Sequence, residues 1–277
     1  MKLKFYKCSP AENMTVLVWD PVEREQYAEV ANEIMEERHL HAEQVGFVTP
    51  PVRKSAEIAA RLEMMGGEFC ANATLSLATV ISFREDIQEK SEGRKKLKLE
   101  SSGVKDAMTC FVDKGESPYS RRVSLQIGLP QAVSDVQIVS EEKSVAGMLV
   151  ELPGIAHLIV DRGNVENPES FFEDALKQLE EKKFDALGIM FFDERKMHLE
   201  PLVWVRATNS LFWEKGCGSG TAALGIAKAS KEKESVDLNI NQPGGVLGIS
   251  VKWQGKAVKE AWLSGDVKIV AEGFTYL

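Results

Sequence analysis

The sequence predicts an α+β fold that is built from two similar halves. Its 277 residues exceed the usual size of one domain, so two domains of roughly 130 residues each are expected. Segments with the alternating pattern of strands outnumber those with the pattern of helices. The series Cys-x-x-x-Thr-x-x-Leu begins at Cys70 and again at Cys217, an offset of 147 residues. This internal repeat favours a duplicated plan in which each half presents one cysteine.

The first half alternates strands and helices up to a Gly-Leu-Pro turn at 128–130, where we expect a domain boundary. Pro21 precedes the first helix and Pro50 follows a strand, positions that suit a residue without an N–H donor. We predict strands over 2–8, 14–19, 45–49, 96–102, 107–113 and 120–128, and helices over 23–37, 54–64 and 71–83.

The second half repeats this alternation and ends on strands. The amphipathic segment 168–182 predicts a surface helix, and an Ala-rich helix is expected from the glycine-rich segment 216–220 to about Ser230. A Gln-Pro-Gly-Gly sequence at 242–245 is typical of a turn. We predict strands over 135–140, 147–152, 156–161, 186–193, 198–206, 235–240, 246–253, 258–264 and 267–275.

The composition is that of an ordinary globular protein with a small-molecule partner. Apolar residues make up 44% and charged residues 27%, and the net charge of −8 is spread without a basic cluster for nucleic acid or an anionic membrane surface. The N-terminal segment lacks the apolar core of a signal peptide, and no apolar run approaches the ~18 residues that a membrane span requires. We therefore expect a cytoplasmic protein that binds neither nucleic acid nor membrane. A homodimer is left open.

The chain has four cysteines, Cys8, Cys70, Cys110 and Cys217. They show no Cys-x-x-Cys spacing and have no neighbouring His pair, so neither a zinc site nor a disulfide framework is expected, and no metal is predicted. Cys8 and Cys110 lie in strand-like segments and are expected to be small buried apolar residues. Cys70 and Cys217 each stand directly before a helix that has small residues in its first turn.

A cysteine at a helix N-terminus is suited to acid–base chemistry. The helix dipole and the exposed N–H groups favour the thiolate and should lower the thiol pKa below ~8.5. Small residues at 71–73 and 218–220 would let a carboxylate reach those N–H groups, which stabilise the charge that develops when a Cα proton leaves. Two thiols on opposite faces of one Cα–H bond would then invert an amino acid without pyridoxal phosphate or any other cofactor. The alternative is that both are core cysteines that cap helices. A nucleotide site at 218–220 is disfavoured because the lysine of a Walker motif is missing.

At these residues the chain resembles the diaminopimelate epimerase superfamily, and the resemblance covers nearly its full length. The segment 68–73, Glu-Phe-Cys-Ala-Asn-Ala, is similar to the family's first cysteine motif, and 216–220, Gly-Cys-Gly-Ser-Gly, to its second. The resemblance implies two pseudo-symmetric lobes, each a β-barrel-like sheet wrapped around a central helix. Residues 1–129 and 266–277 would form the lobe that carries Cys70, and 130–265 the lobe that carries Cys217. The substrate-binding residues that follow from the helix starts and from the resemblance are Asn13, Gln44, Ala71, Asn72, Ala73, Gly218, Ser219 and Gly220.

Three departures from that family argue against diaminopimelate as the substrate. The segment 154–157 reads Gly-Ile-Ala-His where the family has a binding Asn before Pro-His. The family's Glu-Arg pair falls on Thr208 and Asn209, and a second binding Asn falls on the apolar pair 189–190. The clamp for a distal carboxylate and ammonium is therefore missing. His157, in an apolar strand, is expected to be structural.

A closer resemblance is to the histidine racemases that supply D-histidine to opine-type metallophore synthesis. The shared segments are 13–15, 43–47, 68–70, 210–214, 217–221 and 242–245. We therefore expect conversion of L-histidine to D-histidine, with Cys70 and Cys217 as catalytic residues, and Glu43, Glu68 and Glu214 as candidates for an ammonium or imidazole contact. Two alternatives stay open. One keeps the fold but acts on diaminopimelate or another amino acid, and the other is a non-catalytic protein of this fold that binds a small molecule.

Overall fold

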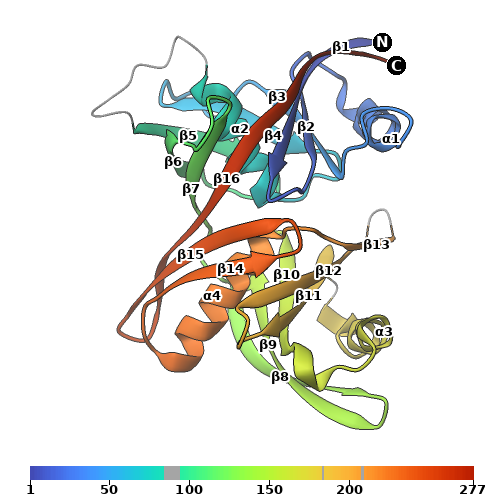
Figure 1. The fold of residues 1–277 in the computed structure, drawn as a ribbon, viewed down its shortest axis with the longest axis vertical. Helices are drawn as coiled ribbons and strands as arrows, with labels where there is room; N and C mark the ends of the chain where they lie inside the picture. Colours follow the sequence, from blue (N-terminus) through green and yellow to red (C-terminus); the bar gives the residue numbers. More distant parts are fainter. Residues whose placement is uncertain (84–93, 183, 207–208) are drawn as a thin grey trace. The chain divides into compact units, whose positions relative to one another are not determined.

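The computed structural model describes residues 1–83, 94–182, 184–206 and 209–277, and its internal contacts divide the chain into two units. Unit 1 comprises Met1–Gln126 and Ser264–Leu277, and unit 2 comprises Ile127–Leu263. Strands and helices are mixed in both, so the predicted α+β class is confirmed (Figure 1). Within the described ranges, no helix is long and apolar enough to cross a membrane.

Eight strands of unit 1 form a closed barrel. They are β1 (Lys2–Pro10), β2 (Thr15–Val18), β3 (Gln44–Thr49), β4 (Ile58–Met64), β5 (Lys95–Ser101), β6 (Met108–Lys114), β7 (Ser120–Gln126) and β16 (Ala257–Tyr276). The hydrogen-bonded order is β1-β2-β3-β4-β5-β6-β7-β16, and β16 pairs back onto β1 (Figure 1). The β2–β3 and β4–β5 pairs are parallel. Closure pairs the outermost strands with each other, which removes the exposed edges of an open sheet.

Helix α2 (Ala71–Ser82) lies inside this barrel. It contacts β1 through β7, and all of its 12 residues are buried. Its polar side chains bond to the helix's own backbone: Ser76 Oγ donates to the Asn72 carbonyl at 2.9 Å, and Thr79 Oγ1 to the Leu75 carbonyl at 3.0 Å. These bonds satisfy hydroxyl groups that would otherwise be costly to bury. The helix predicted over 71–83 is confirmed.

Helix α1 (Tyr27–Met35) follows a short 3-10 turn, η1 (Arg24–Gln26), so the helix predicted over 23–37 is shorter than expected. Its buried residues are Tyr27, Val30, Ala31 and Ile34, the spacing of one apolar helix face. They pack with side chains of β1, β2 and β3, and the Tyr27 and Phe47 rings stack with their centroids 3.8 Å apart. The outer face of these strands is thus covered by α1.

Two secondary-structure predictions in this part of the chain are wrong. The segment 54–64, predicted as a helix, contains strand β4, which pairs antiparallel with β3 and parallel with β5. Its Ala, Leu and Glu residues favour a helix, but pairing on both sides within a closed barrel overrides that weak preference. The strands predicted at 258–264 and 267–275 are one strand, β16, which continues through Gly265 and Asp266.

Strand β16 begins in unit 2 and continues into unit 1. From β16, the strands of unit 2 follow in the order β15-β14-β12-β11-β10-β9-β8, with β13 paired to β12. The β10–β11 pair is parallel, as is the single contact between β12 and β14. Strand β13 was not predicted. The bounds are β8 (Ala132–Ser140), β9 (Lys143–Leu152), β10 (Ile155–Asp161), β11 (Ala186–Asp193), β12 (His198–Val205), β13 (Ser210–Trp213), β14 (Val236–Gln242) and β15 (Gly245–Gln254).

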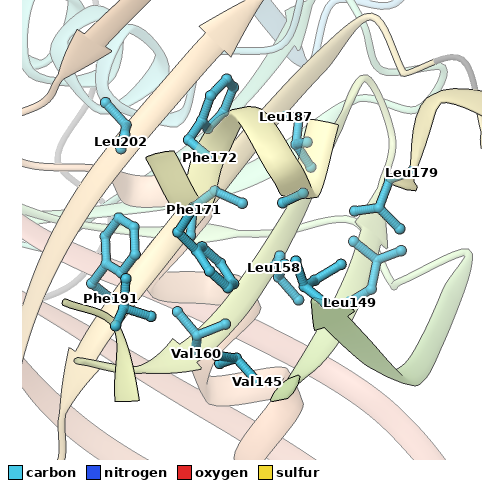
Figure 2. Close-up of a cluster of buried hydrophobic side chains, with 14 of the residues drawn as sticks. Val145, Leu149, Leu158, Val160, Phe171, Phe172, Leu179, Leu187, Phe191 and Leu202 are labelled. Carbon is cyan, nitrogen blue, oxygen red and sulfur yellow. The ribbon is translucent and has the colours of Figure 1, made fainter. Parts of the chain in front are cut away.

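Two helices pack on the sheet of unit 2. Helix α4 (Gly218–Glu232) contacts β9, β10, β11, β14 and β15, and most of its residues are buried. Helix α3 (Pro168–Gln178) inserts Phe171 and Phe172 among apolar side chains of β9 to β12 (Figure 2). The short 3-10 turns η2 (Arg162–Asn164) and η3 (Glu180–Lys182) flank α3, so the helix predicted over 168–182 ends earlier than expected.

Candidate active site

Cys70 is the N-cap residue of α2. Its backbone is extended, with φ −125° and ψ 112°, and its Sγ accepts a hydrogen bond from the Ala73 amide at 3.3 Å. Its carbonyl accepts from both the amide and the Oγ1 of Thr74, at 3.1 and 2.8 Å. The sulfur therefore takes the place that a serine or aspartate oxygen usually takes at a helix start.

Cys217 caps α4 in the same way. Its φ and ψ are −115° and 106°, and its Sγ accepts from the Gly220 amide at 3.3 Å. Its carbonyl accepts from the amide and the Oγ1 of Thr221 at 2.9 and 2.7 Å. The repeated Cys-x-x-x-Thr series of the sequence is thus one capping motif used twice, with the thiol at the helix start in both copies.

Gln44 lies against the first thiol. It is the first residue of β3, and its Oε1 accepts from Cys70 Sγ at 2.8 Å. The parallel register places Gln44 opposite Thr15, and the Gln44 amide donates to the Met14 carbonyl at 3.2 Å. Asn13, which is fully buried, ends the turn between β1 and β2 just before these residues. Unit 1 thus gathers Asn13, Gln44 and Cys70 at the start of β2 and β3.

A second glutamine, Gln242, braces the backbone of the other cysteine. It is the last residue of β14 and is buried. Its Oε1 accepts from the Cys217 amide at 2.7 Å, and its Nε2 donates to Thr221 Oγ1 at 2.7 Å. Sequence reasoning assigned only a turn to this segment and missed the brace. The one signal was its place among the segments shared with histidine racemases.

The small residues after each cysteine are buried in the first helical turn. In any α-helix the first N–H groups point out of the N-terminus, where they can bind a carboxylate. The amides of Ala73 and Gly220 donate to the capping sulfurs. A Cβ added to Gly220 would lie 2.2 Å from Met190 Sδ, so glycine lets this turn pack directly against β11.

The environment of Cys217 favours the neutral thiol. Burial raises the pKa of this thiol well above its ordinary value, and the carboxylate of Glu214, which hydrogen bonds to it, raises it further. The Ser219 hydroxyl and the Gly220 amide act in the opposite direction but are smaller influences. The prediction that the helix start lowers the pKa is therefore wrong for Cys217, because desolvation outweighs the helix-end donors. At neutral pH the Cys217 thiol is therefore protonated and is able to act as an acid.

His157 lies behind the second thiol. It is fully buried in β10, and its Nε2 is 2.9 Å from Ser219 Oγ, which in turn is 3.6 Å from Cys217 Sγ. Burial lowers the pKa of His157 to about 3, so the ring is neutral near pH 7. A Cβ at Gly188 of β11 would lie 2.3 Å from His157 Nδ1, so glycine there makes room for the imidazole. A structural role was expected, but the contact with Ser219 was not.

The three candidate glutamates lie in different surroundings. Glu43 is exposed. Glu68 is partly buried, and burial raises the pKa of its carboxyl. Glu214 follows β13, its amide donates to the Pro201 carbonyl at 3.0 Å, and its side chain contacts Cys217. The structure thus brings Glu214 against Cys217.

The positions that depart from diaminopimelate epimerases are apolar or engaged elsewhere. Ile189 and Met190 are buried in β11, and Ile155 is partly buried at the start of β10. Asn209 Oδ1 accepts from the Trp204 indole at 3.1 Å. Thr208 lies outside the described residues.

Comparison with known proteins gives a consistent result over the whole chain. The family model described as the histidine racemase CntK N-terminal domain matches residues 2–276. A histidine racemase of Fusobacterium nucleatum subsp. nucleatum is 33% identical over 281 residues, covering 99% of this chain and 97% of the relative. One of Staphylococcus aureus is 28% identical and covers 99% and 98%.

Among solved structures, a hydroxyproline epimerase from Agrobacterium vitis with bound trans-4-hydroxy-L-proline is similar. Its TM-score is 0.72 at 12% identity, with 100% of this chain and 93% of that chain covered. At that identity the likeness concerns the fold alone.

Proposed function

The chain belongs to the family of CntK-type histidine racemases and is thus an isomerase, and we propose that it interconverts L-histidine and D-histidine through the thiols of Cys70 and Cys217. The observation that carries the mechanism is the capping motif found twice. Each sulfur sits at a helix start, accepts an amide hydrogen bond at 3.3 Å and is followed by small residues. The proposal requires both thiols to reach one substrate, from opposite faces of its Cα.

In one direction Cys217 gives its proton to Cα while the Cys70 thiolate removes the original proton from the other face. The Cys70 S–H bond and the new Cα–H bond form as the Cys217 S–H bond and the old Cα–H bond break, so the two thiols exchange protonation states. The reverse reaction uses them in the opposite roles. Gln44 suits such a change, because its amide accepts from a thiol through Oε1 and, after a half turn, donates to a thiolate through Nε2.

Loss of the Cα proton pushes negative charge onto the substrate carboxylate. We assign its stabilisation to the first-turn amides at 71–72 and 218–219 and to the buried Asn13, because donors already aimed at the carboxylate need no reorganisation as the charge develops. The reaction in this form uses neither pyridoxal phosphate nor a metal ion.

The proposal includes duplicated lobes. Residues 1–129 with 266–277 would form one lobe and 130–265 the other, each with a sheet wrapped around its central helix. The support is the matching cap at the start of α2 and α4, and the packing of each helix against at least five strands of its own unit.

Histidine suits this site better than diaminopimelate. A second amino-acid head group would bring a carboxylate and an ammonium to positions where this chain offers Ile155, Ile189 and Met190, and burying an unpaired charge costs several kcal/mol. In the cell we propose that the reaction takes place in the cytoplasm and supplies D-histidine to opine-type metallophore synthesis, as the resemblance of the shared segments implies.

The test is a substrate panel without added cofactor. Purified protein is incubated with L-histidine, D-histidine, LL-diaminopimelate and other L-amino acids, and the enantiomers are separated by chiral chromatography. Histidine should approach a racemic mixture from either side while diaminopimelate stays unchanged. Cys70→Ser protein prepared in parallel controls for a contaminating racemase.

Two outcomes would contradict parts of the proposal. If diaminopimelate were the best substrate, the assignment of histidine would fail although the thiol mechanism could stand. If no amino acid were racemised or exchanged its α-proton, the protein would be a non-catalytic binder of this fold.

A further inference from the structure

We propose that Phe212 of β13 recognises the side chain of the substrate by stacking its phenyl ring on the imidazole. The inference rests on the proposed function, because it names the contact that a histidine substrate makes beyond its amino-acid head group. The thiols and the amide donors assigned so far act on the Cα proton and the carboxylate. A residue that distinguishes histidine from other amino acids has to contact the ring.

Strand β13 leads directly to the second thiol. It pairs antiparallel with β12 and is followed by Glu214, three residues before Cys217. The pairing extends one residue past the strand, because the Glu214 amide donates to the Pro201 carbonyl at 3.0 Å. Side chains therefore alternate between the two faces of the sheet up to and including Glu214.

Glu214 identifies the face to which Phe212 points. Its side chain hydrogen bonds to Cys217, so it points to the face of the sheet on which α4 begins. Phe212 is two residues earlier and points in the same direction. The Cα atoms of two such residues are about 7 Å apart along a strand. The Phe212 ring therefore lies on the same face as the Cys217 thiol and close to it.

The residue between these two points to the opposite face. The Trp213 ring centroid lies 5.8 Å from that of Phe191, and Trp213 Nε1 donates to Glu169 of α3 at 3.4 Å. Phe191 belongs to the apolar cluster that packs against α3 (Figure 2). Trp213 is thus held on the α3 face, which leaves Phe212 on the other.

The register of the neighbouring strands gives the same result independently. Phe212 is paired with Val203 of β12, and Val203 is paired with Gly188 of β11, so these residues share one face. Met190 is two residues beyond Gly188 on β11 and points the same way, and it packs against Gly220 in the first turn of α4. The row that contains Phe212 is therefore on the face where α4 and its capping thiol begin.

The exposure and chemistry of Phe212 suit an imidazole. The residue is 57% exposed, although phenylalanine is among the residues most often buried, so its ring is accessible on this face. A neutral imidazole stacks on a phenyl ring, and an imidazolium is attracted to the ring's negative face as a cation. That same negative face disfavours a carboxylate, which agrees with the expected rejection of diaminopimelate.

The experiment measures the affinity for DL-histidine by isothermal titration calorimetry. The racemic mixture is already at equilibrium, so active enzyme produces no net reaction during the titration. Phe212→Leu, which keeps an apolar side chain but removes the ring, should raise Kd about 2- to 12-fold, the effect of one aromatic pair. Phe212→Tyr keeps the ring and should leave Kd unchanged.

The matched control is Leu211→Ala. Leu211 is also exposed and lies in the same strand, but it is paired with Trp204 and points to the α3 face, so its replacement should leave Kd unchanged. A kinetic readout separates stacking from a structural role. In racemisation, Phe212→Leu should raise KM for histidine and keep kcat, because a contact remote from Cα is the same in the ground state and the transition state. A disturbed thiol would instead lower kcat.

Three results would overturn the proposal. They are an unchanged Kd in Phe212→Leu, an equal weakening by Leu211→Ala, and a loss in Phe212→Tyr as large as that in Phe212→Leu. If Phe212→Leu kept its Kd but changed its elution volume in size-exclusion chromatography, the ring would belong to an interface between copies of the chain. If the parent protein did not bind histidine, the proposed function would fail as well, whereas equally tight binding by the parent and Phe212→Leu would refute this inference alone.

Discussion

Replacing Thr221 by valine should destabilise the start of α4 more than the matched change at Thr74 destabilises α2. Both hydroxyls donate to the carbonyl of the capping cysteine, at 2.7 and 2.8 Å, and valine removes that bond at nearly constant volume. The loss of such a bond costs about 1 kcal/mol. Thr221 Oγ1 also accepts from Gln242 Nε2 at 2.7 Å, and leaving that buried amide hydrogen without an acceptor adds about 1–3 kcal/mol.

Hydrogen exchange measured by mass spectrometry can test this difference, because it reports the free energy of local opening for each segment separately. Peptides covering 71–83 and 218–232 should show that Thr221→Val speeds exchange about 5- to 150-fold more than Thr74→Val does in its own helix. Equal effects would mean that the Gln242 brace contributes nothing. Faster exchange confined to α2 would refute the hydrogen-bond assignment altogether.

Two further predictions concern the thiols and the buried histidine. Cys70→Ser and Cys217→Ser should each keep the helix cap, because serine is a preferred N-cap residue, while racemisation falls about 10²- to 10⁴-fold; a folded variant within about tenfold of the parent rate in a chiral assay would contradict the assignment. The pKa of His157 falls from 6.5 to about 3 on burial. Protonation of this histidine should therefore leave the free energy of unfolding unchanged above pH 6.5 and lower it by about 1.4 kcal/mol per pH unit as the pH falls from 6.5 towards 3. His157→Phe should flatten acid unfolding in that window and the same change at exposed His41 should not, as followed by tryptophan fluorescence; superimposable curves for His157→Phe and the parent would refute this.

The fold could be predicted from the sequence where a local pattern decides the structure. Strand β11 has the predicted bounds, and α2 and α4 begin within one residue of the capping cysteines that identified them. Pairing between distant segments could not be predicted. Strand β4 has a helical composition but is held between β3 and β5, and β13 has four residues that form a strand because β12 lies beside them.

The candidate site likewise has some features that the local sequence predicts and others that depend on packing. The two helix-start thiols and the small residues after them could be read directly, because a cap and its first turn are contiguous in sequence. The protonation of Cys217 could not, because the burial and the Glu214 contact that raise its pKa come from the packing of the whole unit. The His157–Ser219 pair spans 62 residues, and no local pattern connects a histidine in an apolar strand with a serine in a helical turn.

The central claim is that two different thiols act on opposite faces of one Cα, and deuterium incorporation at the start of the reaction tests it most directly. L-histidine is converted in D2O to a small extent, the enantiomers are separated, and the α-position of each is analysed by mass spectrometry and NMR. The D-histidine formed should carry deuterium, because its proton comes from a thiol that has exchanged with solvent, while the recovered L-histidine should remain protiated. D-histidine that retains the original α-proton, or equal deuterium in the two enantiomers, would show a single base acting on both faces and would contradict the account.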